Sequence, residues 1–207
     1  MKFLNLVVSL LFILLLFKDP FSQRTLIPNF EPYPDTFNYI NPSLNLVQGN
    51  GFTMAREGRS IAINVPPLYS FTFIPFFLIK ADPRMAYFAN VALALTSFFF
   101  FWQILKRILN NKLFLYVILI LYITNYFIYW VPSIIMAENL TLTLYLAAVY
   151  FLLSKTTKVN AFIIALFAVG SYATKYANIP ITLSIAFVFF GKTIFSSLKL
   201  NQKIKFL

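Results

Sequence analysis

The 207-residue chain contains neither cysteine nor histidine. These two absences exclude disulfide bonds, Cys/His zinc sites, cysteine nucleophiles and Ser-His-Asp triads. Acidic residues are also scarce, with 6 Asp and Glu against 17 Lys and Arg. A catalytic acid or base must therefore be a Lys, a Tyr or one of six carboxylates. These carboxylates are Asp19, Glu31, Asp35, Glu57, Asp82 and Glu138.

The composition indicates a membrane protein. Hydrophobic residues make up 60% of the chain and charged residues 11%, whereas charged residues form about a quarter of an average soluble domain. The net charge of +11 arises from short basic clusters between apolar runs, a pattern typical of the cytoplasmic ends of membrane segments. No polar domain is present that could offer a basic face to nucleic acid, so nucleic acid is not an expected partner.

Apolar runs predict six membrane-spanning helices. The first, 3–17, is followed by no small-residue cleavage pattern, so we interpret it as an uncleaved anchor with a cytoplasmic N-terminus. A polar stretch separates it from the five remaining predicted helices within 85–191, whose apolar runs are 85–105, 113–131, 140–153, 161–174 and 179–190.

The run 68–79 decides the topology. If it crosses the membrane, nine later Lys and Arg residues fall outside the cytoplasm, against the positive-inside rule. The run has twelve residues and contains Pro75, whereas a span needs about 20 apolar residues. We therefore interpret 66–79 as a re-entrant or juxtamembrane segment inside a large outer loop, 18–84.

The predicted fold is an all-α polytopic membrane module covering 1–207, with about six transmembrane helices, or seven if 66–79 also crosses. Short juxtamembrane helices would lie in the outer loop, and 192–207 would form a basic cytoplasmic tail. Both termini would be cytoplasmic in a multi-pass protein of the inner (plasma) membrane.

All six acids fall on the outer side in this topology. Five lie in the loop 18–84, and Glu138 lies in a second outer turn, at the start of an apolar run. Acids are costly in lipid and are favoured at helix N-termini, so position alone could explain Glu138. A functional role is the alternative.

Several motifs occur in a recognisable order. "DTFNY" (35–39) and "LVQGNGF" (46–52) are followed by "PPLYS" (66–70), "DPRMAYF" (82–88), "MAENL" (136–140) and "GSYATKYANIP" (170–180). This order resembles the N-terminal module of the C-type membrane glycosyltransferase superfamily. The most similar branch is that of the bacterial relatives of protein O-mannosyltransferases and of lipid A aminoarabinose transferases.

The resemblance implies transfer of a sugar from a polyprenyl-phosphate donor to a lipid, glycan or protein acceptor at the outer membrane face. It places Asp35 and Glu138 at the catalytic centre, with Asp35 as the general base for the acceptor hydroxyl. Arg84 and Lys175 match donor-phosphate residues, although Lys175 stands where the family usually has Arg, and Arg56 and Arg59 are the next candidates. The phosphate assignment is thus weaker than that of Asp35.

Aromatic residues and a metal complete the expected site. Tyr33, Tyr39 and Tyr69 are candidates for contact with the sugar or acceptor, and an interfacial aromatic belt is the alternative explanation. Asp35 and Glu138 are also candidate ligands for Mg or Mn, which prefer oxygen donors. Two ligands a hundred residues apart do not establish such a site.

Other functions stay open on the sequence. Family members are usually about twice as long, so we expect the chain to be the N-terminal part of a longer enzyme, or to need a partner chain that supplies C-terminal helices. A non-catalytic remnant or subunit is the main alternative. A small transporter subunit is less favoured, because only Lys175 approaches an intramembrane charge.

Overall fold

The computed structural model describes residues 2–17, 35–56, 59–61, 63, 65–155 and 157–204, without the side chains of residues 2, 55–56, 59–61 and 195–204. It confirms the all-α class, with one small hairpin of β1 (Met54–Arg56) and β2 (Arg59–Ile61). The α-helices are α1 (Lys2–Phe17), α2 (Asp35–Val47), α3 (Leu68–Phe71), α4 (Ile74–Ile79), α5 (Ala86–Ile108), α6 (Lys112–Ile123), α7 (Tyr126–Trp130), α8 (Glu138–Leu152), α9 (Lys158–Thr174) and α10 (Ile179–Ile204). Short 3-10 helices are η1 (Pro83–Met85), η2 (Val131–Ser133) and η3 (Tyr176–Asn178).

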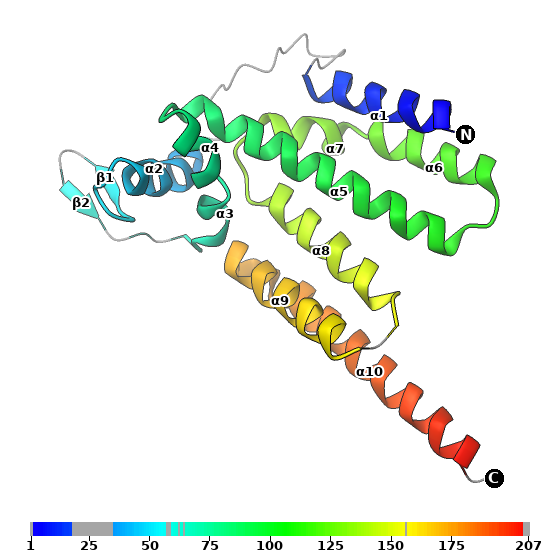
Figure 1. The fold of residues 1–207 in the computed structure, drawn as a ribbon. Helices are drawn as coiled ribbons and strands as arrows, with labels where there is room; N and C mark the ends of the chain where they lie inside the picture. Colours follow the sequence, from blue (N-terminus) through cyan, green and yellow to red (C-terminus); the bar gives the residue numbers. More distant parts are fainter. Residues whose placement is uncertain are drawn as a thin grey trace.

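Helix α5 is the centre of the arrangement (Figure 1). Helix α8 packs along α5, α9 packs along α8, and α10 packs along α9. Helices α1 and α6 contact each other beside α5. Helices α2, α3 and α4 gather with the hairpin at one end of α5, while α10 extends away from the other helices toward the C-terminus (Figure 1).

Polar caps divide the apolar sequence into short helices. Asp82 accepts a hydrogen bond from the backbone N–H of Arg84 at the start of η1. Asn111, Asn125 and Thr157 cap α6, α7 and α9 in the same way. Side-chain caps satisfy amides that a helix N-terminus leaves without intrahelical partners. Of these caps, Asn125 falls inside the run 113–131, and the chain bends there where one span was predicted.

The prediction of six or seven membrane crossings is wrong. In the described part of the chain, two helices are long and apolar enough to cross a membrane, Pro83–Ile108 and Tyr176–Ile194. Lys112–Ile123 and Tyr126–Ser133, bent by 58°, would make a third if they act as one span. Helices α1, α8 and α9 have 16, 15 and 17 residues, fewer than the about 20 that a bilayer requires. The structure thus indicates a membrane protein with two or three candidate spans.

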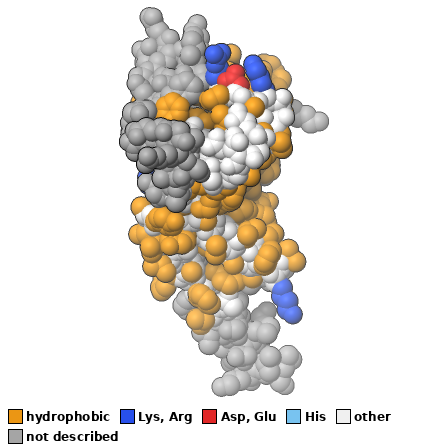
Figure 2. All heavy atoms as spheres, turned by 90° about the vertical axis from the view of Figure 1, so that its left-hand side faces the viewer, with side chains coloured by type: hydrophobic (Ala, Val, Ile, Leu, Met, Phe, Trp, Pro, Cys, Tyr) orange, Lys and Arg blue, Asp and Glu red, His pale blue; other side chains and the backbone are white. Residues whose placement is uncertain are grey.

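The exposed surface is largely apolar, as expected of a protein that lies in a membrane. Figure 2 shows hydrophobic side chains over most of the coloured middle of one face, with charged groups toward its margins. On α10, Leu183 and Phe187 are 62% and 81% exposed. Such side chains are stable when they face lipid.

A buried polar network fixes α3 and α8 to α5. The Tyr69 hydroxyl donates to Asn90 Oδ1 at 2.8 Å, and Asn90 Nδ2 donates to the Ile134 carbonyl at 2.8 Å. Asn139 Nδ2 donates to the Asn90 carbonyl at 2.8 Å, and the Thr143 hydroxyl donates to the Leu93 carbonyl at 3.1 Å. Buried polar groups without partners are costly, so these bonds select one packing arrangement.

Replacement of Asn90 by Ala should destabilise the fold by ~1–3 kcal/mol, because it removes the acceptor of the buried Tyr69 hydroxyl and one of the two donors to the Ile134 carbonyl. Tyr69→Phe should cost less, since it removes one of these bonds. Thermal unfolding in detergent would measure both. Thr96→Ala is the matched control, because Thr96 is exposed and bonds only its own helix at Ala92. Equal midpoints for Asn90→Ala and Thr96→Ala would show that the network does not stabilise the fold.

Candidate active site

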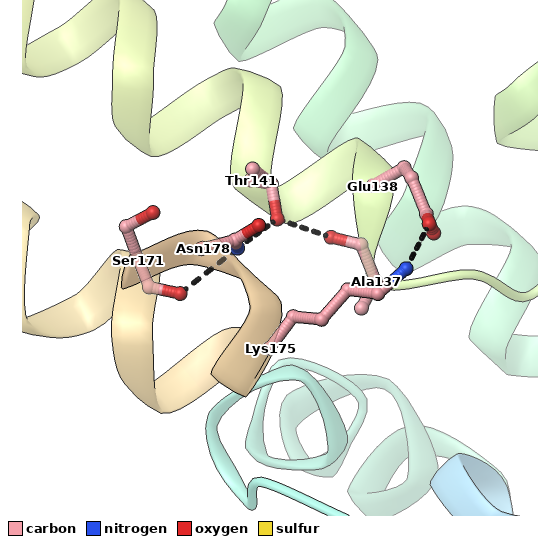
Figure 3. Close-up of polar contacts among 6 residues, drawn as sticks. All are labelled: Ala137, Glu138, Thr141, Ser171, Lys175 and Asn178. Carbon is pink, nitrogen blue, oxygen red and sulfur yellow. Dashed lines mark hydrogen bonds and ion pairs between the residues drawn. The ribbon is translucent and has the colours of Figure 1, made fainter. Parts of the chain in front are cut away.

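Two charged residues meet where α8 begins and α9 ends. Glu138 lies in the first turn of α8, where a negative charge interacts favourably with the helix dipole. Lys175 ends α9 in an extended backbone conformation, with φ −157° and ψ 125°. The break redirects the chain into η3 and leaves the lysine side chain at the turn, facing Glu138 (Figure 3).

Glu138 and Lys175 form an ion pair, with Lys175 Nζ 2.5 Å from Glu138 Oε1. The side chains of Lys175 and Glu138 are 40% and 41% exposed. Solvent screens pairs at such exposure, and the contribution to stability is less than about 1 kcal/mol. Both side chains therefore stay accessible to a ligand.

An amide clamp holds this turn in place (Figure 3). Asn178 Nδ2 donates to Thr141 Oγ1 at 2.8 Å and to the Ser171 carbonyl at 3.0 Å. Thr141 in turn donates to the Ala137 carbonyl at 3.0 Å. These bonds join α8, α9 and η3, so the Lys175 position is fixed by three elements.

Glu138 lies between two cavities. One, of about 300 Å³, is lined by Glu138, Thr141, Leu142, Tyr145, Lys175, Ala177, Asn178 and Ile181. The other, of about 250 Å³, is lined by Ser97, Phe127, Ile128, Val131, Pro132, Glu138, Asn139 and Leu142. Both are mostly apolar and each holds a few polar groups, the usual character of a small-molecule site.

The first-loop acid approaches the same place through α2. Asp35 is exposed in the first turn of α2, and Tyr39 follows one turn later. The Tyr39 ring packs edge-on against Tyr69, with 5.0 Å between ring centroids. Burial raises the pKa of Tyr39, and the negative charges of Glu138 and then Asp35 raise it further. Tyr39 also packs against the buried cluster that contains Ala137 and Leu140, on either side of Glu138 in the sequence. We use the name carboxylate site for Asp35, Tyr39, Glu138 and Lys175.

Other predicted residues lie elsewhere or outside the described part of the chain. Arg84 is 76% exposed and lies beside Asp82, with 3.8 Å between Arg84 Nε and Asp82 Oδ1. Tyr69 is fully buried, so it has no surface to offer a sugar and instead supports Tyr39. Tyr33 and the side chains of Arg56 and Arg59 are outside the described residues.

A divalent cation held by Asp35 and Glu138 stays a prediction. No group of three or more His, Cys, Asp or Glu that could hold a metal occurs in the described residues. Glu138 Oε1 is already engaged by the Lys175 ammonium, a positive charge that opposes a second cation. Mg²⁺ can be held by one or two carboxylates while waters complete its coordination shell, so Asp35 and Glu138 stay candidate ligands.

Sequence reasoning missed the amides that build this region. Asn90, Asn139 and Asn178 make the bonds that position Tyr69, α8 and Lys175. The sequence did contain a sign of these amides, because Asn90 and Asn139 stand among apolar residues. A polar side chain in such a run needs a buried partner, but the sequence does not say which one.

No protein-family model, curated protein or solved structure matches the chain.

Replacement of Glu138 by Gln should lower the pKa of Tyr39, because it removes a negative charge that disfavours the phenolate. Asp35→Asn should lower it by less, in keeping with the smaller effect of Asp35. NMR of protein with 13C-labelled tyrosine would follow the titration, with Tyr39→Phe to assign the signal. Lys158→Gln, at the opposite end of α9 from Lys175, is the control. An unchanged pKa of Tyr39 in both acid variants would show that the carboxylates do not meet there.

Proposed function

We propose that this chain is a membrane glycosyltransferase, or the N-terminal module of one, which moves a sugar from a polyprenyl-phosphate donor to a lipid, glycan or protein acceptor outside the cytoplasm. One observation carries the proposal. Asp35 and Glu138, the two acids that the resemblance assigns to the catalytic centre, both raise the pKa of Tyr39. This convergence of residues 103 positions apart supports a shared site.

Asp35 serves as the general base in this proposal. Its side chain is exposed at the start of α2, where an acceptor hydroxyl can approach it. As the acceptor oxygen bonds to the anomeric carbon, its proton passes to the Asp35 carboxylate. The bond between the anomeric carbon and the phosphate oxygen breaks, and its electron pair leaves on the polyprenyl phosphate.

Lys175 stabilises the leaving phosphate. An ammonium group has three N–H donors, and one of them reaches Glu138. A phosphate can therefore accept a second N–H bond without separating the ion pair. Fixed positive charge next to the leaving oxygen is most effective in the transition state, when negative charge develops there. Glu138 then acts as a positioning residue that keeps the ammonium oriented.

The adjoining cavities have room for the small groups of such a reaction. The cavity of about 300 Å³ contains both Glu138 and Lys175. Thr141 and Asn178 add polar contacts there, whereas Leu142 and Ile181 are apolar. This mixture suits a sugar phosphate joined to a lipid, because the sugar phosphate needs polar contacts whereas the polyprenyl group needs apolar ones.

The test uses the full chain in liposomes with radiolabelled hexose or 4-amino-arabinose on undecaprenyl phosphate, and measures release of undecaprenyl phosphate. Asp35→Asn should lower the rate by ~10²–10⁴-fold, the usual contribution of a general base. Asp82→Asn is the matched control, because Asp82 contacts Lys80 and Arg84 in an exposed turn. Full activity of Asp35→Asn would contradict the role of Asp35 as the base, and a wild-type chain inactive with both donors would contradict catalysis by this chain alone.

A further inference from the structure

Two cations converge on the C-terminal end of α8, at the opposite end of that helix from Glu138. Arg107 of α5 donates to the Tyr150 carbonyl at 2.8 Å and to Ser154 Oγ at 2.6 Å. Its guanidinium lies over the Tyr150 ring, 3.7 Å from the ring centroid. Lys192 of α10 donates to the Leu152 carbonyl at 2.5 Å and to the Ser154 carbonyl. Positive charge is favoured there, because helix C-termini present unpaired carbonyls.

An apolar groove runs from this cationic end along α8 and α10. Its volume is about 530 Å³, and its lining is Tyr145, Val149, Leu152, Leu153, Ser184, Ile185, Val188 and Lys192. From Ser184 to Lys192 the groove follows α10 for about 12 Å, at 1.5 Å per residue. Tyr145 also lines the cavity next to Glu138, so the two hollows adjoin.

The groove opens toward the surroundings of the protein. The candidate span Tyr176–Ile194 is only 11% buried, and Val188 and Leu153 are 53% and 46% exposed. In a membrane this surface would meet lipid tails. A hydrocarbon chain can therefore enter sideways, without any movement of α8 or α10.

The geometry points to a binding site for an anionic phospholipid, with one acyl chain in the groove and the phosphate beside Lys192. An ammonium group has three N–H donors, and that of Lys192 donates to the carbonyls of Leu152, the last residue of α8, and Ser154, which follows it. The third is available to a phosphate oxygen. Basic pockets between membrane helices bind anionic headgroups in this way. This site is independent of the sugar transfer proposed above.

Charge at the groove end selects a lipid over a protein helix as the occupant. A second apolar helix in the groove would cover Lys192 and take its charge out of water, which is costly without an anionic partner. A phospholipid supplies that partner in the same molecule as the hydrocarbon chain.

Native mass spectrometry of the full chain in detergent tests the site, with phosphatidylglycerol and phosphatidylcholine of identical acyl chains as probes. Wild type should bind phosphatidylglycerol roughly fivefold more tightly, the factor expected for one surface cation. Lys192→Gln should abolish this preference, whereas Lys192→Arg should keep it. Lys158→Gln is the matched charge control. Equal binding of the two lipids to wild type would overturn the proposal.

The acyl chain is tested separately with variants that fill the groove. Val188→Trp should weaken binding of both lipids, because it occupies the space of the chain, whereas the outward-facing Phe187→Trp should not. Free glycerol phosphate should fail to compete, since it lacks the chain. Circular dichroism would confirm that each variant is folded. Full competition by glycerol phosphate, or normal binding to Val188→Trp, would show that the groove holds no chain.

Discussion

The buried amide of Asn90 is the constraint on which the arrangement of the outer segments depends. Its Oδ1 accepts a hydrogen bond from the Tyr69 hydroxyl of α3, and its Nδ2 donates to the Ile134 carbonyl. The backbone carbonyl of Asn90 accepts a hydrogen bond from Asn139 Nδ2 of α8. In an apolar protein these bonds cannot be exchanged freely for water. The position of α2 follows, because Tyr39 packs on the Tyr69 ring that Asn90 holds.

Charge then divides between the two ends of α8. The N-terminal end carries Glu138 in its ion pair with Lys175, and Tyr39 and Asp35 act there as well. The C-terminal end receives Arg107 and Lys192 on its carbonyls. Both placements agree with the helix dipole, which favours negative charge at the N-terminal end and positive charge at the C-terminal end. One short helix thus positions a candidate catalytic site and a candidate lipid site, about 22 Å apart along its 15 residues.

Apolar runs predicted where helices form, but they did not predict how long each helix is. The run 85–105 became α5 (Ala86–Ile108), and 161–174 became most of α9. The run 113–131 was predicted as one span, yet Asn125 caps a new helix and the chain bends. The resemblance selected Asp35, Glu138 and Lys175, but the ion pair and the burial of Tyr69 depend on tertiary packing. Sequence spacing carries no information on such contacts.

The central claim is that the first-loop acid and the second outer acid meet at one site. Because the chain has no cysteine, Asp35→Cys with Glu138→Cys can be tested with a short bifunctional thiol reagent in the membrane. We predict efficient intramolecular cross-linking of this pair and none for Asp35→Cys with Lys155→Cys, since Lys155 follows the far end of α8. Absence of cross-linking between positions 35 and 138, or equal cross-linking of both pairs, would contradict the account.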